Sequence, residues 1–177
     1  MSGTALKLVK DLSGSILDLG GGGEGVIGRV YRNQVTAIDN RQEELDEAPD
    51  GPAAKLLMDA SALTFPDCAF SHVTAFFSFM YMSHETQARA VSEAARVLQP
   101  GGSLHIWDAG ISTAFPDPFV VDLEIDAAGD TVHTTYGVID PDAEQNSAHF
   151  IALCQAAGLR FAHCREWDGI FYLRFVK

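Results

Sequence analysis

The sequence predicts an α/β protein built on a mostly parallel β-sheet, and two observations predict it. From residue 16 onward, short apolar segments typical of buried strands alternate with segments of helical periodicity. The first apolar segment, residues 16–19, runs into a glycine-rich turn that ends where a helix can begin. Such alternation is typical of parallel strands joined by right-handed helical crossovers.

The N-terminal third supplies the first elements of this pattern. Residues 4–12 place apolar side chains between charged ones, so we expect a short amphipathic helix there. The predicted strands and helices that follow are strand 16–19, helix 26–31, strand 34–38, helix 41–48 and strand 55–58. The second of these strands ends at Asp39 and the third at Asp59, so both acids are expected at one edge of the sheet.

The middle of the chain continues the alternation. Residues 70–77 are β-branched and aromatic and predict the fourth strand. Ser83 is a suitable N-cap for a helix with apolar residues at helical spacing up to Leu98. Residues 100–102, Pro-Gly-Gly, are expected to end that helix, and residues 103–107 form a fifth strand closed by Asp108.

The alternation breaks over residues 109–140, which we interpret as an insertion after the fifth strand. Residues 119–126 and 131–139 flank a turn and predict a β-hairpin. A helix over residues 143–157 follows, and strands 160–166 and 170–176 are joined by a turn with Asp168-Gly169, a hairpin signal.

Composition limits the partners of this chain. Its 177 residues fit a single domain, and its net charge of −12 with four lysines argues against nucleic acid or an anionic membrane surface as a partner. No apolar run reaches the ~20 residues that span a bilayer. The three cysteines form no metal-spaced set and are expected to be reduced thiols, which favours a cytoplasmic location.

The glycine-rich turn indicates a cofactor. Gly20, Gly22 and Gly25, followed by Asp39 about 20 residues further on, satisfy the spacing of a dinucleotide-binding fingerprint. On this spacing alone an NAD(P)-binding oxidoreductase is a candidate. Asp18, directly before the turn, would repel a pyrophosphate but suits a cationic amino-acid group. Asp59 could accept a hydrogen bond from an adenine amino group.

With these motifs and the junction from Arg96 to Gly102, the chain resembles class I S-adenosylmethionine-dependent methyltransferases of the short type that act on small molecules. The resemblance implies a three-layer Rossmann-like sandwich with a seven-stranded sheet of order 3-2-1-4-5-7-6, the seventh strand antiparallel. It implies S-adenosyl-L-methionine as the cofactor and a small molecule as the substrate. The cofactor-binding residues that it implies are Asp18, Gly20, Gly22, Asp39, Asn40, Asp59, Ala60 and Phe76.

The sequence departs from the family pattern in places that bear on the methyl acceptor. Gly23-Glu24 lengthens the turn before Gly25, and Met80-Tyr81 replaces a common His-His pair. Methyl transfer from a sulfonium mainly requires alignment of the reacting atoms, with a base only for a poor nucleophile. The catalytic residues are therefore left open, with Tyr81, Asp108, His133 and Tyr136 as candidates by position, and we expect no metal.

Three functional hypotheses remain at this point: a small-molecule methyltransferase, a nicotinamide oxidoreductase, and a non-catalytic module that binds S-adenosylmethionine. No tyrosine is followed four residues later by lysine, which disfavours one common oxidoreductase pattern. Residues 109–140 leave from the end of the fifth strand and mix apolar with polar side chains. We expect this insertion to be either a lid over the acceptor pocket or the interface of a homodimer.

Overall fold

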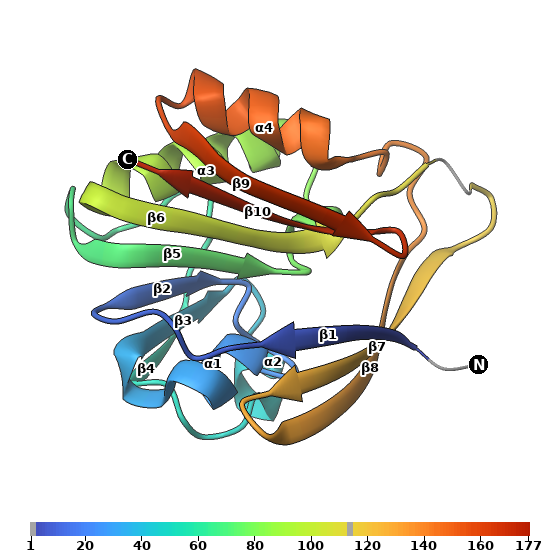
Figure 1. Ribbon diagram of the computed structural model, residues 1–177, viewed down its shortest axis with the longest axis horizontal. Helices are drawn as coiled ribbons and strands as arrows, with labels where there is room; N and C mark the ends of the chain where they lie inside the picture. The colour runs from blue at the N-terminus through green and yellow to red at the C-terminus, as the bar shows by residue number, and fades with distance from the viewer. Residues whose placement is uncertain (1–2, 113–114) are drawn as a thin grey trace.

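The computed structural model describes residues 3–112 and 115–177, and its main feature is a seven-stranded sheet (Figure 1). The sheet order is β4-β3-β2-β5-β6-β10-β9, in which β10 is antiparallel to both neighbours and the other pairs are parallel. Its strands are β2 (Ile16–Leu19), β3 (Val35–Asp39), β4 (Ala54–Leu57), β5 (Phe70–Phe76), β6 (Leu98–Ala109), β9 (Arg160–Trp167) and β10 (Ile170–Val176). This is the α/β fold, with the strand arrangement, that the sequence led us to expect.

The helices follow the predicted pattern from residue 26 onward. They are α1 (Val26–Tyr31), α2 (Gln42–Glu47), α3 (His84–Val97) and α4 (Ser147–Ala156), with short 3-10 turns η1 (Arg32–Gln34) and η2 (Phe79–Tyr81). Ser83 caps α3, as predicted, by accepting a hydrogen bond from the Thr86 amide. Helix α4 begins later than predicted because Asn146 caps it through the His149 amide.

The junction after α3 also differs from the prediction. The helix ends at Val97, and β6 already begins at Leu98, so the Pro-Gly-Gly segment lies inside the strand. Gly101, at φ +79°, donates its amide to the Lys177 carbonyl, and the Lys177 amide donates to the Gly102 carbonyl. The C-terminal strand therefore holds this segment in the sheet, an interaction that local turn signals do not reveal.

The helix predicted for residues 4–12 is wrong, because residues Thr4–Leu8 form strand β1. Leu6 and Leu8 are buried while Ala5 and Lys7 are exposed, which is the two-residue period of a strand. Strand β1 pairs in parallel with β7 (Phe119–Ala127), which pairs with β8 (Asp130–Val138) in the predicted hairpin. We call β1, β7 and β8 the three-stranded cover. Residues 113–114 of the predicted insertion, and residues 1–2, lie outside the described residues.

Two hydrophobic cores lie on opposite faces of the seven-stranded sheet. On one face, α3 and α4 pack against buried aliphatic and phenylalanine side chains such as Leu104, Leu173 and Phe175. On the other face, α1 and the three-stranded cover bury Leu123 and Ile125 against the sheet. The predicted hairpin is therefore part of a covering layer, and Figure 1 shows β7 and β8 next to β1, outside the row of seven strands.

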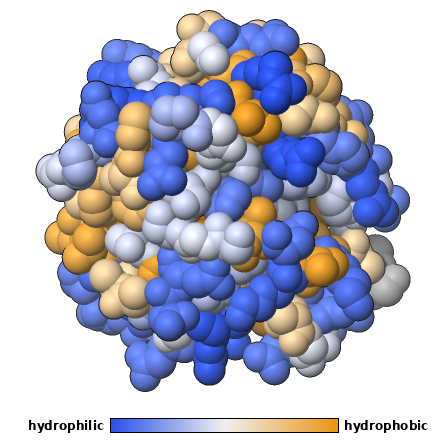
Figure 2. All heavy atoms as spheres, turned by 60° about the vertical axis from the view of Figure 1, so that its left-hand side comes forward, coloured by the Kyte–Doolittle hydropathy of each residue, from blue (hydrophilic) through white to orange (hydrophobic). Residues whose placement is uncertain are grey.

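The surface is mixed in character. Figure 2 shows a face on which hydrophilic residues surround small groups of hydrophobic ones. Cys68, Cys154 and Cys164 are free thiols. Among the helices in the described residues, none combines the length and apolar character required to cross a membrane.

Candidate functional site

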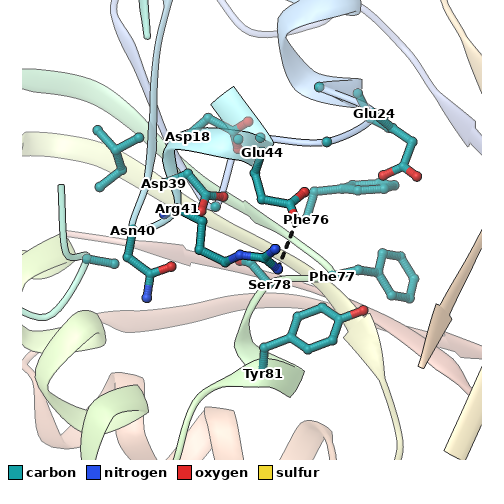
Figure 3. A pocket seen from close by; sticks show the side chains of 18 of the residues that line it. Asp18, Glu24, Asp39, Asn40, Arg41, Glu44, Phe76, Phe77, Ser78 and Tyr81 are labelled. Carbon is teal, nitrogen blue, oxygen red and sulfur yellow. Dashed lines mark hydrogen bonds and ion pairs between the residues drawn. The ribbon is translucent and has the colours of Figure 1, made fainter. Parts of the chain in front are cut away.

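A cavity of about 720 Å³ opens where strands β2, β3, β4 and β5 end, which we call the strand-end cavity (Figure 3). Ligands of open α/β sheets bind at this edge because the carboxyl ends of parallel strands and the turns after them converge there. The volume is within the usual range for small-molecule and cofactor sites. All residues that the sequence analysis named for cofactor binding line this cavity, namely Asp18, Gly20, Gly22, Asp39, Asn40, Asp59, Ala60 and Phe76.

The glycine-rich turn is fixed by close approach to neighbouring elements. Gly20 has φ +72°, and a Cβ built there would lie 2.5 Å from the Cβ of Ser78. At Gly22 a Cβ would lie 2.5 Å from the Cβ of Glu44 and 2.9 Å from a carboxylate oxygen of Asp39. Gly25 precedes α1 at φ +54°. The turn therefore needs glycine for packing against α2 and for backbone conformation, besides any room that it leaves for a ligand.

Asp18 is a buried carboxyl group beside this turn. Its side chain accepts a hydrogen bond of 2.7 Å from the Thr74 hydroxyl, and only 2% of the residue is exposed. Burial raises the pKa of Asp18 to about 7, the Thr74 hydrogen bond opposes this shift, and the nearby charge of Asp39 adds to it. A cationic ligand group at this position would stabilise the ionised carboxylate.

The end of β3 and the start of α2 form the next wall of the cavity. Asp39 accepts a hydrogen bond of 3.0 Å from the Arg41 amide, which orients its carboxylate toward the turn. The Arg41 guanidinium extends across the cavity and pairs with Glu44 at 2.9 Å, as Figure 3 shows. Asn40 lies between Asp39 and Arg41 in the sequence and also lines the cavity.

The remaining cofactor candidates come from β4 and β5. Asp59 accepts hydrogen bonds of 2.8 Å from both the amide and the hydroxyl of Ser61. Ala60 and Phe76 are both mostly buried at the cavity wall. Ser78 donates a hydrogen bond of 2.8 Å to the Leu19 carbonyl and so joins the ends of β2 and β5.

The charge of the lining is strongly negative. It contains six carboxylates and one guanidinium, namely Asp18, Glu24, Asp39, Glu44, Glu47, Asp59 and Arg41. Such a lining attracts a cation and repels a pyrophosphate. The cavity therefore favours a cationic ligand over a dinucleotide.

The three-stranded cover reaches the cavity through β8. Glu24, in the glycine-rich turn, accepts hydrogen bonds from the Thr134 hydroxyl at 2.6 Å and the Tyr136 hydroxyl at 3.0 Å. The Tyr136 ring stacks on Phe77, with ring centroids 5.2 Å apart. Phe77 has a positive φ of 49°, a strained conformation for a bulky residue. The residue that lengthens the glycine motif thus attaches the turn to the cover.

The candidate catalytic residues divide into two pairs. Tyr81, which is 55% exposed, and Tyr136 line the cavity. Asp108 and His133 do not. Asp108 is fully buried and accepts hydrogen bonds from the Phe79 amide and the Gln145 side chain, and burial raises its pKa to about 7. His133 is exposed on β8, 3.9 Å from Glu124.

Sequence reasoning missed several residues that the fold brings to this cavity. Arg41 and Glu44 were assigned only to a charged helix, although they follow Asp39 by two and five residues and so lie near the strand end. Phe77 closes the predicted fourth strand and Ser78 follows it, so both could have been inferred from the rule that ligands bind at strand ends. The same rule could not have identified Thr135, because its position at the cavity depends on how the cover packs against the sheet.

The residues present fit S-adenosylmethionine. A buried acid beside a glycine turn suits its amino group, an acid after the second parallel strand suits a ribose diol, and the negative lining suits its net positive charge. When bound, this cofactor supplies a methyl group on a positively charged sulfur.

Comparison with known proteins supports this fit. Residues 17–106 match the family model described as methyltransferase domain. No curated protein shows a significant sequence match to the chain.

Similar solved structures include an S-adenosylmethionine-dependent methyltransferase from Mesorhizobium loti, 18% identical with a TM-score of 0.64, covering 92% of this chain and 90% of that one. Another such enzyme, from Methanosarcina mazei, is 19% identical with a TM-score of 0.65 and covers 94% of each chain. The [4+2]-cyclase SpnF is 18% identical with a TM-score of 0.66, covering 94% of this chain and 76% of that one. These structures share the fold, and the family match covers half of the sequence. The chain therefore belongs to the methyltransferase domain family and is an S-adenosylmethionine-dependent methyltransferase.

Proposed function

We propose that this enzyme methylates a neutral or cationic small molecule that binds between Tyr81 and Tyr136. The observation that carries the proposal is the charge of the strand-end cavity, six carboxylates against one guanidinium. An anionic acceptor would meet this lining at a cost, whereas an amine or a neutral hydroxyl compound would not. Tyr136 belongs to β8, and Tyr81 lies close to it, beside the Gly137 backbone of the same strand.

The proposed roles of the side chains follow from their placement. Asp18 holds the amino group of the cofactor and Asp39 its ribose hydroxyls, while Asp59 and Ala60 border its adenine. Phe76 and Phe77 exclude water from the centre of the cavity. The Tyr136 hydroxyl already donates to the Glu24 carboxylate, so its oxygen is oriented and can accept a hydrogen bond from an acceptor group.

The insertion then serves as a wall of the acceptor pocket rather than as a detachable lid. Strand β8 contributes Thr135 and Tyr136 to the cavity while β7 belongs to the second core. Self-association through the outer edge of β8 is the alternative use of the insertion, and molecular mass in solution by light scattering distinguishes the two. A monomer with full turnover supports the wall, and turnover that depends on dimer formation supports the interface.

The cofactor assignment is tested by Asp39→Ala. We expect affinity for S-adenosylhomocysteine to fall by roughly 1.5–3 kcal/mol, the range for hydrogen bonds to a charged group, measured by calorimetry. Glu43→Ala is the matched control, because it removes a neighbouring negative charge that does not line the cavity. Equal affinities of the Asp39→Ala variant and the unchanged protein would exclude Asp39 from the site.

The acceptor class is tested with radiolabelled S-adenosylmethionine and three matched panels of small molecules, namely amines, neutral alcohols and the corresponding carboxylates. Turnover is expected with members of the amine or neutral panel. Turnover confined to carboxylates would refute the proposed acceptor class and leave the cofactor assignment intact.

A further inference from the structure

A second cavity, of about 460 Å³, lies on the face of the sheet that the cover leaves open, between β1 and strands β6, β10 and β9. It is separate from the strand-end cavity, and the two share no lining residue. Its floor consists of aromatic and polar side chains, among them His105, Trp107, Tyr172, His163, Arg165 and Trp167. We call it the open-face cavity.

The composition of this floor differs from that of the opposite face of the same strands. Leu104, Leu173 and Phe175 point to the helical side and are fully buried. On the open side, the Trp107 and Tyr172 rings stack with centroids 4.7 Å apart, and the Arg165 guanidinium lies 4.8 Å from the Trp167 ring centroid. Tryptophan, tyrosine and arginine are the residues that binding sites favour, because they combine a large apolar surface with a polar end.

A chain of hydrogen bonds across strands β5, β6 and β10 holds part of this floor in place. His72 contacts the Ser13 carbonyl at 3.1 Å and the Ser103 hydroxyl at 2.8 Å. Ser103 contacts His105 at 2.7 Å, and His105 contacts the Tyr172 hydroxyl at 2.8 Å. These side chains are therefore held in place before any ligand binds, which reduces the entropic cost of binding.

The donor and acceptor of each hydrogen bond in this chain follow from its last acceptor, the Ser13 carbonyl. A carbonyl only accepts, so Nε2 of His72 carries a proton, and Nδ1 of the neutral ring accepts from Ser103. Ser103 then accepts from Nε2 of His105, and Nδ1 of His105 accepts from Tyr172. Burial lowers the pKa of both histidines, that of His105 to about 3, in agreement with neutral rings. The Tyr172 hydroxyl thus donates inward, and its oxygen lone pairs remain available to the cavity.

The charged groups of the lining indicate the sign of the ligand. Asp126 pairs with Lys7 at 3.0 Å, Asp11 accepts from the Tyr31 hydroxyl at 3.0 Å, and Glu124 lies near His133. Within residues 3–112 and 115–177, no carboxylate lies within ion-pair distance of Arg165. Asp126 is paired with a cation and Asp11 with a hydroxyl group, while Glu124 lies 3.9 Å from an exposed histidine. Arg165 is therefore the cation of the lining that remains available to an anion.

We propose that the open-face cavity is a second binding site, for a planar aromatic molecule that carries an anionic group and a hydrogen-bond donor. The ring packs on Trp107 and Tyr172, the donor reaches the Tyr172 oxygen, and the anion pairs with Arg165. Simple aromatic acids and nucleotides share this chemistry. The site is independent of the proposed acceptor.

Tryptophan fluorescence tests this site directly, because Trp107 and Trp167 are the two tryptophans of the chain and both line the open-face cavity. We would titrate the protein with 4-hydroxybenzoate and with adenosine monophosphate. Saturable changes are expected with at least one of them, and the stronger binder identifies the source of the ligand. Benzoate, which lacks the donor, should bind more weakly than 4-hydroxybenzoate.

Variants locate the binding. Arg165→Gln is expected to weaken the binding of either probe about tenfold, the effect of a lost hydrogen bond to a charged group. Arg160→Gln, on the same strand but outside the cavity, should leave the affinity for both probes unchanged. Tyr172→Phe should weaken 4-hydroxybenzoate to the level of benzoate and leave benzoate unaffected.

Three results would overturn the second site. One is the lack of a saturable fluorescence change with either probe up to roughly millimolar concentrations. Another is equal affinity of Arg165→Gln and the unchanged protein. The third is loss of probe binding in Asp39→Ala, which would place the probe in the strand-end cavity. Failure of S-adenosylmethionine to bind would contradict the cofactor assignment and leave this test unaffected.

Discussion

The strand-end cavity and the three-stranded cover are built in opposite ways. The cavity takes its cofactor candidates from the ends of strands that follow one another along the chain, from Asp18 to Phe76. The cover joins β1, near the N-terminus, to β7 and β8, more than 100 residues later. The cavity can therefore be inferred from local order in the sequence, whereas the cover exists only once distant segments meet.

The largest expected effect tests whether the cover is a full core layer. Ile125 is completely buried between the cover and the sheet, so Ile125→Ala should lower the free energy of unfolding by about 2–5 kcal/mol. Leu173→Ala, on the helical face, should cost a similar amount. Urea unfolding followed by circular dichroism measures both.

Val120→Ala is the control for this pair, because Val120 lies on β7 but is 51% exposed. It should change stability by less than about 0.5 kcal/mol. If Ile125→Ala also changes the free energy of unfolding by less than about 0.5 kcal/mol, the packing of the cover against the sheet contributes little to stability. Removal of residues 112–138 would expose the second core, so single substitutions separate stability from function better than deletion does.

The second prediction concerns the cavity itself. Gly22→Val should destabilise the fold by about 1–3 kcal/mol, because the new side chain must displace Glu44 on α2. It should also weaken S-adenosylhomocysteine binding, since Asp39 and Arg41 lie beside the same clash. Gly110→Ala is the control, because its nearest contact would be a backbone oxygen at 3.5 Å. A folded Gly22→Val variant with normal affinity would show that this packing does not shape the site.

The strand-end cavity and the three-stranded cover also show how much of the structure the sequence predicted. The parallel strands, the hairpin and the acids at the strand ends followed from apolar runs, turn residues and the position of each acid after a strand. The segment at residues 4–8 was misassigned, because two leucines two residues apart fit a strand while the surrounding charges also fit a helix. Its parallel pairing with β7 is a long-range contact that local periodicity cannot show.

The same limit applies within the site. The acids Asp39 and Asp59 were placed by strand order, but the ion pair between Arg41 and Glu44 depends on how α2 lies over the glycine turn. Among the catalytic candidates, sequence position alone did not separate Tyr81, which lines the cavity, from Asp108, which is fully buried and does not line it. A residue at a strand end can point to either side of the sheet.

The third prediction compares Asp18 with Asp108, two buried acids whose pKa burial raises to about 7. Because both folded values exceed the ordinary value of 3.8, the native state binds more protons than the unfolded chain between about pH 4 and 7. Stability from these groups is present at low pH and is lost as pH rises through about 7. Affinity for the cation S-adenosylmethionine should instead rise with pH up to about 7, by at most tenfold per pH unit.

Calorimetry across this pH range distinguishes the two acids. Asp18→Asn should abolish the pH dependence of cofactor affinity, since Asp18 lines the cavity. Asp108→Asn should retain the pH dependence of cofactor affinity, because Asp108 does not line the cavity. A pH dependence that survives Asp18→Asn would assign the titrating group to another residue.

The smallest expected effect lies where the two regions meet, at the contact of Glu24 with Tyr136. The Tyr136 hydroxyl donates to a partly buried carboxylate at 3.0 Å, so Tyr136→Phe and Glu24→Gln should each destabilise the protein slightly. In the double variant the two losses should not add, and a coupling free energy of about 1 kcal/mol is expected. Thr135→Val is the matched control, because its hydroxyl donates to Asp122 within the cover. Its loss should add fully to that of Glu24→Gln. Complete additivity for Glu24 and Tyr136 as well would mean that the cover and the glycine turn are energetically independent, and that β8 lines the cavity without holding the turn in place.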